Sequence, residues 1–418
     1  MIASKKAFEA KCLSATCRSC GGQGLRGVLD LGQMPLSDGL LTERQLVAPE
    51  PYYPLQAAFC PDCSLVQILE TVPPEILFGE DYPYYSSFSQ ALLEHSRKNA
   101  LALIASRNLT ARSFVVEVAS NDGYLLRNFV EQGIPVLGID PAPGPVAAAR
   151  KIGVPTMQEF FGIDLARRLR DEGKRADVII ANNIFAHVAD TNGFCTALAM
   201  LLKEDGVAVI EVPYVKELVD KCEFDTIYHE HLCYFSVTAV DRLMRKHDLY
   251  LNSIEQLSIH GGSLRLYLEP KENVGQSVRG LLAEERLVGL DRFEYYQGFA
   301  KRVQRIRREL KAVLQELKRC GCSIAAYGAA AKGTILLNYV GAGRQLIDFV
   351  VDRNVHKQGK YMPGVHIPIS EPERIAREMP DYVLLLPWNF KEEILRQCDD
   401  YRRCGGRFII PIPRPEIV

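Results

Sequence analysis

The stretch that decides the fold is Phe114–Leu126, FVVEVASNDGYLL. Its valines predict a buried strand that stops at small polar residues and continues as a helix from Tyr124. In an open α/β fold, such a loop surrounds a ligand crevice at the carboxyl edge of a parallel sheet. Asp140 ends the next apolar segment, PVLGID, where an acid can accept both hydroxyls of a ribose. The sequence therefore predicts a doubly wound α/β domain with a nucleoside site.

The residues of this loop indicate which ligand it binds. A dinucleotide loop carries G-x-G-x-x-G, but here Ala119 and Ser120 stand where glycines are expected and Gly123 is present alone. Glu117 and Asp122 would repel a phosphate, whereas they suit a ligand with positive charge and hydroxyls. This chemistry points to S-adenosylmethionine, and an ordinary buried strand and turn is the alternative. The predicted cofactor residues are Glu117, Ser120, Asn121, Asp122, Gly123, Asp140 and Asn182.

Composition limits the classes of protein that the chain can form. Its 418 residues favour two to four domains, and 47% hydrophobic with 24% charged residues is typical of a globular protein. A formal charge of −1 argues against a nucleic-acid partner. No apolar run approaches the ~20 residues that span a bilayer, and the first residues, MIASKKAFEAKC, show no signal core. We therefore expect a cytoplasmic protein without a membrane partner.

Two C-x-x-C pairs indicate a metal site near the N-terminus. Cys17 and Cys20 form the first pair, and Cys60 and Cys63 form the second. Four thiolates on two tight turns match a closed, tetrahedral structural zinc site. Two unrelated pairs of buried thiols or a redox pair are the alternatives; Cys12 is a surplus thiol that we do not count as a ligand. Between the two pairs we expect irregular structure and short strands that the metal holds together.

The α/β core follows a tyrosine-rich linker, residues 80–89, and a helical pattern from Ala91 to Ala105. The linker tyrosines indicate either packing or a lid over a cofactor. We expect strands near 114–119, 135–140, 177–182 and 206–212, and helices near 124–132, 145–151 and 193–202. The third strand ends at Asn182, so His187 is expected just past it, on the crevice side.

The densest polar cluster is Phe224–Ser236, FDTIYHEHLCYFS, which contains Tyr228, His229, Glu230 and His231. A histidine flanked by a carboxylate is the usual composition of a general base. The alternatives are a metal bound by the two histidines and a polar cap on the sheet. Downstream, His260 begins an HGGS turn between two strands, which shapes an acceptor pocket or is a simple hairpin turn.

The last third of the chain repeats the strand–loop–helix pattern. After charged helices at about residues 274–319, the turn YGAAAKG carries Tyr327 and Lys332 at a helix start, an arrangement that suits phosphate. The next strand ends at Asp352 and is followed by several cations, and a third ends in PWNF. A basic rim in this second, smaller doubly wound unit favours a nucleotide-linked substrate.

Taken together, the motifs resemble the sugar C-methyltransferases of deoxysugar pathways over essentially the whole chain. The likeness rests on the zinc pairs, EVASNDGYLL, YHEH, HGGS, YGAAAKG and PWNF. It implies an S-adenosylmethionine enzyme that methylates a carbon beside the keto group, C3, of a nucleotide-diphosphate 4-keto-deoxysugar. It also implies His231 as the base, with Tyr228, Glu230 and His187 near the reacting sugar. A tyrosine from the linker joins them; Tyr84 is our choice, although Tyr82 and Tyr85 stay open.

The resulting fold class is α/β in four parts. We expect a zinc-binding module at 1–75, a Rossmann-like methyltransferase domain at 76–272, a helical connector at 273–320 and a smaller Rossmann-like domain at 321–418. The expected substrate-binding residues are His260, Lys332 and Tyr327. An O- or N-methyltransferase, a nucleotide-dependent oxidoreductase and a non-catalytic scaffold are the rival functions. The sequence leaves the nucleotide, the sugar and the oligomeric state open.

Overall fold

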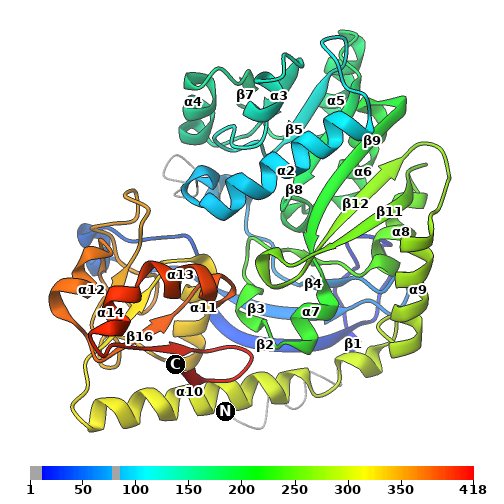
Figure 1. The fold of residues 1–418 in the computed structure, drawn as a ribbon. Helices are drawn as coiled ribbons and strands as arrows, with labels where there is room; N and C mark the ends of the chain where they lie inside the picture. Colours follow the sequence, from blue (N-terminus) through cyan, green and yellow to red (C-terminus); the bar gives the residue numbers. More distant parts are fainter. Residues whose placement is uncertain (1–11, 78–84) are drawn as a thin grey trace.

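The computed structural model describes residues 12–77 and 85–418, which form three sheets with helices packed around them (Figure 1). In Figure 1 the N-terminal strands lie beneath the central, seven-stranded sheet, and the C-terminal unit, in orange and red, lies to one side. The long helix α10 (Phe299–Arg319) runs below the N-terminal strands and toward the C-terminal unit. None of the described helices combines the length and the apolar character that crossing a membrane requires.

The N-terminal module is a five-stranded antiparallel sheet rather than mainly irregular chain. Its order is β1 (Cys12–Leu13), β2 (Leu25–Pro35), β3 (Tyr52–Phe59), β4 (Val66–Ile68) and β10 (Cys233–Tyr234). Strand β2 has 11 residues and β3 has 8, longer than the sequence predicted. Cys233 pairs with Gln67, so the segment that follows YHEH completes the zinc module's sheet. This pairing ties the polar cluster directly to the metal module.

The central sheet carries the predicted Rossmann-like core. Its order is β11 (Tyr250–Leu257), β12 (Ser263–Glu269), β9 (Leu202–Pro213), β8 (Ala176–Asn182), β5 (Val115–Val118), β6 (Val136–Ile139) and β7 (Thr156–Met157). The strands from β9 to β7 are parallel, and β11 and β12 form an antiparallel hairpin at one edge. The predicted HGGS turn closes this hairpin. All four predicted strands are present because their valine- and isoleucine-rich cores are buried on both faces.

Helices lie around the central sheet and, for α7, beside the N-terminal strands (Figure 1). They are α2 (Gln90–Ser106), α3 (Arg127–Val130), α4 (Pro143–Lys151), α5 (Ile163–Asp171), α6 (Thr191–Leu201), α7 (Val215–Asp220) and α8 (Val237–Arg245). Helix α3 is shorter than the predicted 124–132 because residues 124–126 form turns before it and residues 131–133 form turns after it. The short 3-10 segments η3 (Ser86–Phe88), η4 (Phe185–His187) and η5 (Phe224–Thr226) each contribute at least one residue to the wall of a cavity at the carboxyl edge of this sheet.

The last sheet confirms the second, smaller doubly wound unit. Its order is β15 (Ile369–Ser370), β14 (Val350–Val351), β13 (Ile324–Tyr327), β16 (Tyr382–Leu385), β17 (Arg407–Ile410) and β18 (Glu416–Ile417), parallel except for β18. Its helices are α11 (Ala331–Val340), α12 (Glu373–Glu378), α13 (Lys391–Gln397) and α14 (Asp399–Arg403), with η8 (Trp388–Phe390) before α13. Helices α9 (Gln276–Val288) and α10 form the connector. One hydrophobic cluster includes Leu29, Ile210, Leu310 and Ile409, so the parts share a continuous core.

Candidate active site

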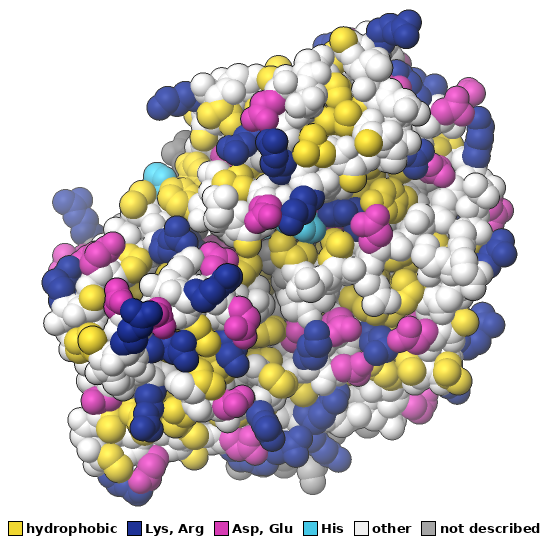
Figure 2. Space-filling view, in the orientation of Figure 1, with side chains coloured by type: hydrophobic (Ala, Val, Ile, Leu, Met, Phe, Trp, Pro, Cys, Tyr) yellow, Lys and Arg dark blue, Asp and Glu magenta, His cyan; other side chains and the backbone are white. Residues whose placement is uncertain are grey.

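A cavity of about 800 Å³ lies where the three sheets meet. Asp38 of the N-terminal module, Asn121, Asp140 and His231 of the core, and Lys332 of the C-terminal unit all line it. The carboxyl edges of both parallel sheets therefore open into one space. On the face drawn in Figure 2, cationic and anionic side chains are interspersed rather than gathered by sign.

Some of the residues predicted to bind S-adenosylmethionine line the cavity, and the others lie behind its wall. Asp140 accepts hydrogen bonds from the backbone N–H groups of Asn121 and Ala142, both at 2.9 Å, and these three residues line the cavity with Asn182. Positive φ angles at Ala119, Asn121 and Gly123, 55°, 49° and 77°, give the loop its tight path. Asp140 thus fixes the loop and also presents its carboxylate at the edge where a ribose is expected.

Four of the residues predicted to bind S-adenosylmethionine lie behind this wall. Glu117 is 1% exposed, and burial, with Asp140 and Asp122 nearby, raises its pKa well above the usual range. The Ser120 hydroxyl packs against Gly138. A side chain at Gly123 would meet Val154 and Ala149, so close packing requires glycine there. Asp122 accepts a hydrogen bond from the backbone of Ser87 at 3.1 Å. These residues shape the loop from within.

The end of the tyrosine-rich linker crosses the donor loop. The backbone N–H of Ser86 donates to Asn121 Oδ1 at 2.9 Å. The ring of Tyr85 lines the cavity and stacks on His356 of the C-terminal unit, with 4.8 Å between ring centroids. Tyr82 and Tyr84, and the side chain of His260, lie outside the described residues. Tyr85 is the linker tyrosine that can be placed at the cavity.

His231 is held by two polar partners in an orientation suited to a base. Its Nδ1 is 3.0 Å from the Thr226 carbonyl oxygen, an acceptor, so Nδ1 carries the hydrogen. Its Nε2 is 2.8 Å from the Tyr228 hydroxyl and presents the lone pair, by the same assignment. The carbonyl of Thr226, which no sequence motif singles out, fixes the tautomer. A backbone carbonyl leaves no side-chain signal, so sequence reasoning missed it.

His187 completes the pair of imidazoles expected at the cavity. Its ring lies edge-on to that of His231, with centroids 4.7 Å apart, and both line the cavity. Burial lowers the pKa of His187 to about 4. The imidazole is therefore neutral at neutral pH and can donate or accept a hydrogen bond without carrying charge.

Glu230 and His229 do not share the surroundings of His231. The carboxyl group of Glu230 is buried beside Asp38 and Lys357; burial raises its pKa, Asp38 raises it further and Lys357 opposes the rise. Lys357 lies 3.8 Å from an Asp38 oxygen and donates to the Ala329 carbonyl at 2.7 Å. The His229 Nε2 donates to the Pro54 carbonyl at 3.2 Å, in the N-terminal module. This placement does not favour a metal site shared by the two histidines.

The C-terminal loop differs from the expected phosphate cradle. The Asp352 carboxylate already accepts the N–H groups of Ala329 and Asn354, both at 2.7 Å, which repeats the two bonds that Asp140 makes. The Lys332 ammonium donates to Asn389 Oδ1 at 2.9 Å and lies 4.5 Å from the centre of the Trp388 ring. The hydroxyl of Tyr327 is 3.4 Å from Gln397, and Tyr327 is not part of the cavity wall.

The cavity wall contains more acids than bases. Its cations are Lys332, Arg353 and Lys357, and its acids are Asp38, Glu75, Asp140, Glu159, Asp190, Glu223, Glu230 and Asp352. The predicted basic rim is therefore present but is largely compensated by carboxyl groups. Burial raises the pKa of Glu223 to about 7 and that of Asp225, just behind the wall, to about 6, so part of this negative charge is removed near neutral pH.

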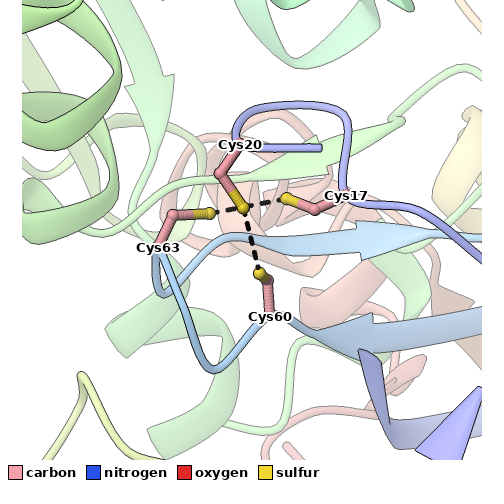
Figure 3. A group of neighbouring side chains, drawn as sticks. All are labelled: Cys17, Cys20, Cys60 and Cys63. Carbon is pink, nitrogen blue, oxygen red and sulfur yellow. Dashed lines mark hydrogen bonds between the residues drawn. The ribbon is translucent and has the colours of Figure 1, made fainter. Parts of the chain in front are cut away.

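The four predicted zinc ligands converge on one point (Figure 3). Their sulfur atoms all lie within 4.8 Å of one another, with Cys17–Cys63 at 3.4 Å and Cys20–Cys60 at 3.5 Å. Tetrahedral Zn²⁺ with bonds near 2.3 Å separates its sulfur ligands by about 3.8 Å, so the cluster fits the ion. Across residues 12–77 and 85–418, no other cluster of three or more His, Cys, Asp or Glu ligand atoms is as close.

The zinc turn also supports the His187 segment. Thr191 and Asn192, at the start of α6, donate to the backbone carbonyl of Arg18 in the first C-x-x-C turn, at 2.9 and 3.0 Å. His187 lies four residues before Thr191. The first C-x-x-C turn therefore holds the start of α6, the helix that follows the His187 segment.

Comparison with known proteins identifies the family. Three family profiles match consecutive parts of the chain: a zinc binding domain at 17–78, a methyltransferase domain at 91–254 and a C-methyltransferase C-terminal domain at 258–413. The chain is 35% identical to the C-methyltransferase NovU of Streptomyces niveus over 405 residues, which covers 96% of both chains. The chain belongs to this C-methyltransferase family.

The chain is therefore an S-adenosylmethionine-dependent C-methyltransferase with a zinc-binding N-terminal module, as its motifs indicated. A more limited match, 29% over 100 residues, links 23% of it to 39% of a ubiquinone biosynthesis O-methyltransferase of Bartonella quintana (strain Toulouse). Among solved structures, magnesium protoporphyrin IX methyltransferase from Synechocystis PCC 6803 with bound S-adenosylmethionine matches with TM-score 0.33 and 14% identity. That match covers 42% of this chain and 78% of the other.

Proposed function

We propose that this C-methyltransferase methylates the carbon beside the keto group of a nucleotide-diphosphate 4-keto-deoxysugar, at C3. The proposal is supported by the geometry of His231, whose Nδ1–H donates to the Thr226 carbonyl and whose Nε2 lies 2.8 Å from the hydroxyl of Tyr228, another residue of the cavity wall. A carbon becomes a nucleophile only after it loses a proton. An imidazole whose tautomer is fixed, and whose basic Nε2 accepts from the Tyr228 hydroxyl until the substrate arrives, is suited to remove it.

The proton step follows from these contacts. Nε2 of His231 takes the proton from the carbon next to the ketone, and the electron pair of that C–H bond moves into an enolate. The Thr226 carbonyl stabilises the imidazolium that forms, because it already accepts the Nδ1 hydrogen. When Nε2 takes the proton, its hydrogen bond from the Tyr228 hydroxyl is broken, and that hydroxyl and the neutral His187 can then donate to the enolate oxygen.

The donor is held on the other side of the same cavity. S-adenosylmethionine supplies an electrophilic methyl group on a sulfonium, which the enolate carbon attacks. Asn121, Asp140 and Asn182 would hold it, and their oxygens and amides suit its hydroxyls and its positive charge. Because donor and acceptor regions share one cavity, positioning of the two reactants supplies much of the rate. Zinc takes no part in this step and remains in its closed site.

The test is product analysis with a panel of substrates. Nucleotide-linked 4-keto-6-deoxysugars carrying thymidine, guanosine or cytidine diphosphate are incubated with the enzyme and S-adenosylmethionine. Mass spectrometry should show one added methyl group, and NMR should place it on the carbon beside the ketone. Methylation on oxygen or nitrogen would instead support the O- or N-methyltransferase alternative and contradict the proposal.

Replacing Asp140 by Asn should weaken donor binding about 10- to 100-fold, because a charged hydrogen-bond acceptor contributes roughly 1.5–3 kcal/mol. Calorimetry with S-adenosylhomocysteine measures this affinity. The matched variant is Asp352→Asn, which removes the equivalent carboxylate from the C-terminal loop, where Asp352 makes the same pair of backbone bonds. It should leave the donor affinity unchanged. Equal effects from both variants would show that Asp140 acts only on loop stability.

A further inference from the structure

Three sequence motifs meet at a point of the cavity wall that the proton and methyl steps do not use. The HGGS turn at η6 (Ile259–Gly261) contacts the PWNF turn at η8 across the boundary between the core and the C-terminal unit. The YGAAAKG lysine, Lys332, bonds to Asn389 of that turn. Glu223, three residues before Thr226, lies against the HGGS turn and lines the cavity.

Glu223 is packed tightly and is only 4% exposed. A side chain at Gly261 would come within 2.6 and 2.7 Å of its two carboxylate oxygens, so the turn approaches it as closely as glycine allows. Among the described residues, none donates a hydrogen bond to its Oε1. A buried carboxylate oxygen without a donor is costly, and a bound ligand is the usual partner at a cavity wall.

Several side chains around Glu223 bond to one another. Trp388 Nε1 donates to Asp225 Oδ2 at 2.8 Å, and Lys332 is bound to Asn389 and stacked over the Trp388 ring. Lys221 donates to the Gly261 carbonyl on the outer side of the turn. Among the described residues, this network leaves Glu223 Oε1 and Asp225 Oδ1 without a donor, and of these two residues Glu223 lines the cavity.

The charge balance decides which ligand group fits. Glu223 and Asp225 lie near the Lys332 ammonium, and Glu223 also lies near Lys221 and Glu217. Acids and cations are therefore close to balance, and a phosphate would find no excess of cations here. A cationic group would compete with Lys332. A neutral donor beside a carboxylate and an ammonium avoids both problems, and a hydroxyl can donate to the first and accept from the second.

We propose that Glu223, with Lys332 beside it, forms a subsite for a hydroxyl group of the acceptor, and that the carboxylate accepts the hydrogen bond of that hydroxyl. This assignment rests on the proposed nucleotide-sugar acceptor and adds a determinant of its specificity. The hydroxyl can belong to the hexose or to the ribose of the nucleotide. Both sources share the same chemistry at Glu223.

The test measures binding rather than turnover. Protein saturated with S-adenosylhomocysteine is dialysed against the 4-keto-6-deoxyhexose nucleotide that binds best, against 2-deoxy and 3-deoxy hexose analogues, and against the ribose and 2′-deoxyribose forms of the nucleotide. The wild type should bind the analogue that lacks the recognised hydroxyl about 10- to 100-fold more weakly. Glu223→Ala should bind the full substrate equally weakly and should no longer discriminate against that analogue.

Two further variants complete the design. Glu223→Gln keeps the shape and a neutral acceptor, so it should fold normally and lose only part of the discrimination. Glu217→Gln is the matched control, because Glu217 packs on the other glycine of the turn, Gly262, and pairs with Lys221 away from the cavity wall. It should discriminate as the wild type does.

The outcomes separate the two proposals. If the wild type binds the nucleotide sugars and Glu223→Ala still discriminates against every deoxy analogue, the hydroxyl subsite is wrong and the proposed function stands. If the wild type binds none of the nucleotide sugars, the proposed function fails and the subsite fails with it.

Discussion

Replacing His231 by Asn should lower kcat for methyl transfer at least 10²- to 10⁴-fold while leaving the affinity for S-adenosylhomocysteine unchanged. General base catalysis contributes a rate factor of about this size, and Asn has no basic nitrogen to accept the proton. The residues that we propose for the donor, Asn121 and Asp140, are bonded to each other in a different loop, so we expect their contacts to persist. Steady-state kinetics and calorimetry measure the two quantities.

A second measurement isolates the proton step. With wild-type enzyme in D₂O and S-adenosylhomocysteine in place of the donor, the keto-sugar should exchange the hydrogen beside its ketone, as followed by NMR. His231→Asn should abolish this exchange. The matched control is His229→Asn, which alters the neighbouring histidine of the same motif, whose ring bonds to the Pro54 carbonyl instead. Normal exchange in His231→Asn would remove this histidine as the base.

Loss of the zinc site should destabilise the whole enzyme. Binding of a structural zinc contributes about 10–16 kcal/mol in zinc-finger peptides, as much as the ~5–15 kcal/mol total stability of a domain. Cys60→Ser should therefore lower the melting temperature by ~10 °C or more and remove bound zinc. Chelation of zinc from the wild type should have the same effect. Thermal melting and elemental analysis follow these changes.

Activity should fall together with the zinc content. Strand β10, which begins two residues after His231, pairs with β4 of the zinc module, and α6 is bonded to the first cysteine turn. Loss of the metal therefore disturbs both imidazole segments. Cys404→Ser is the matched control, because Cys404 is an exposed, free thiol far along the chain from the module. A Cys60→Ser protein with normal zinc content and normal melting would contradict a structural zinc site.

Features that depend on residues close together in the chain could be predicted from their pattern. The two C-x-x-C pairs place two thiolates on each of two tight turns, which is why the metal cluster could be predicted. The apolar strand ending in a small polar loop, followed by Asp140, indicated the donor crevice because the loop and acid of a Rossmann unit are close in sequence. The run of titratable side chains in YHEH likewise predicted a general base in that segment.

Which of these side chains line the cavity depends on how distant segments pack together. Glu117 and Asp122 carry the charge that the sequence assigned to the donor, but the loop turns them inward, and Asp140 remains on the wall. Glu230 is next to His231 in the chain, yet its neighbours are Asp38 and Lys357 from the other two parts. The tautomer of His231 depends on the Thr226 backbone. The packing of the Glu223 carboxylate depends on Gly261, in a turn 38 residues later. Such contacts join distant segments through packing, and no local pattern in the sequence records them.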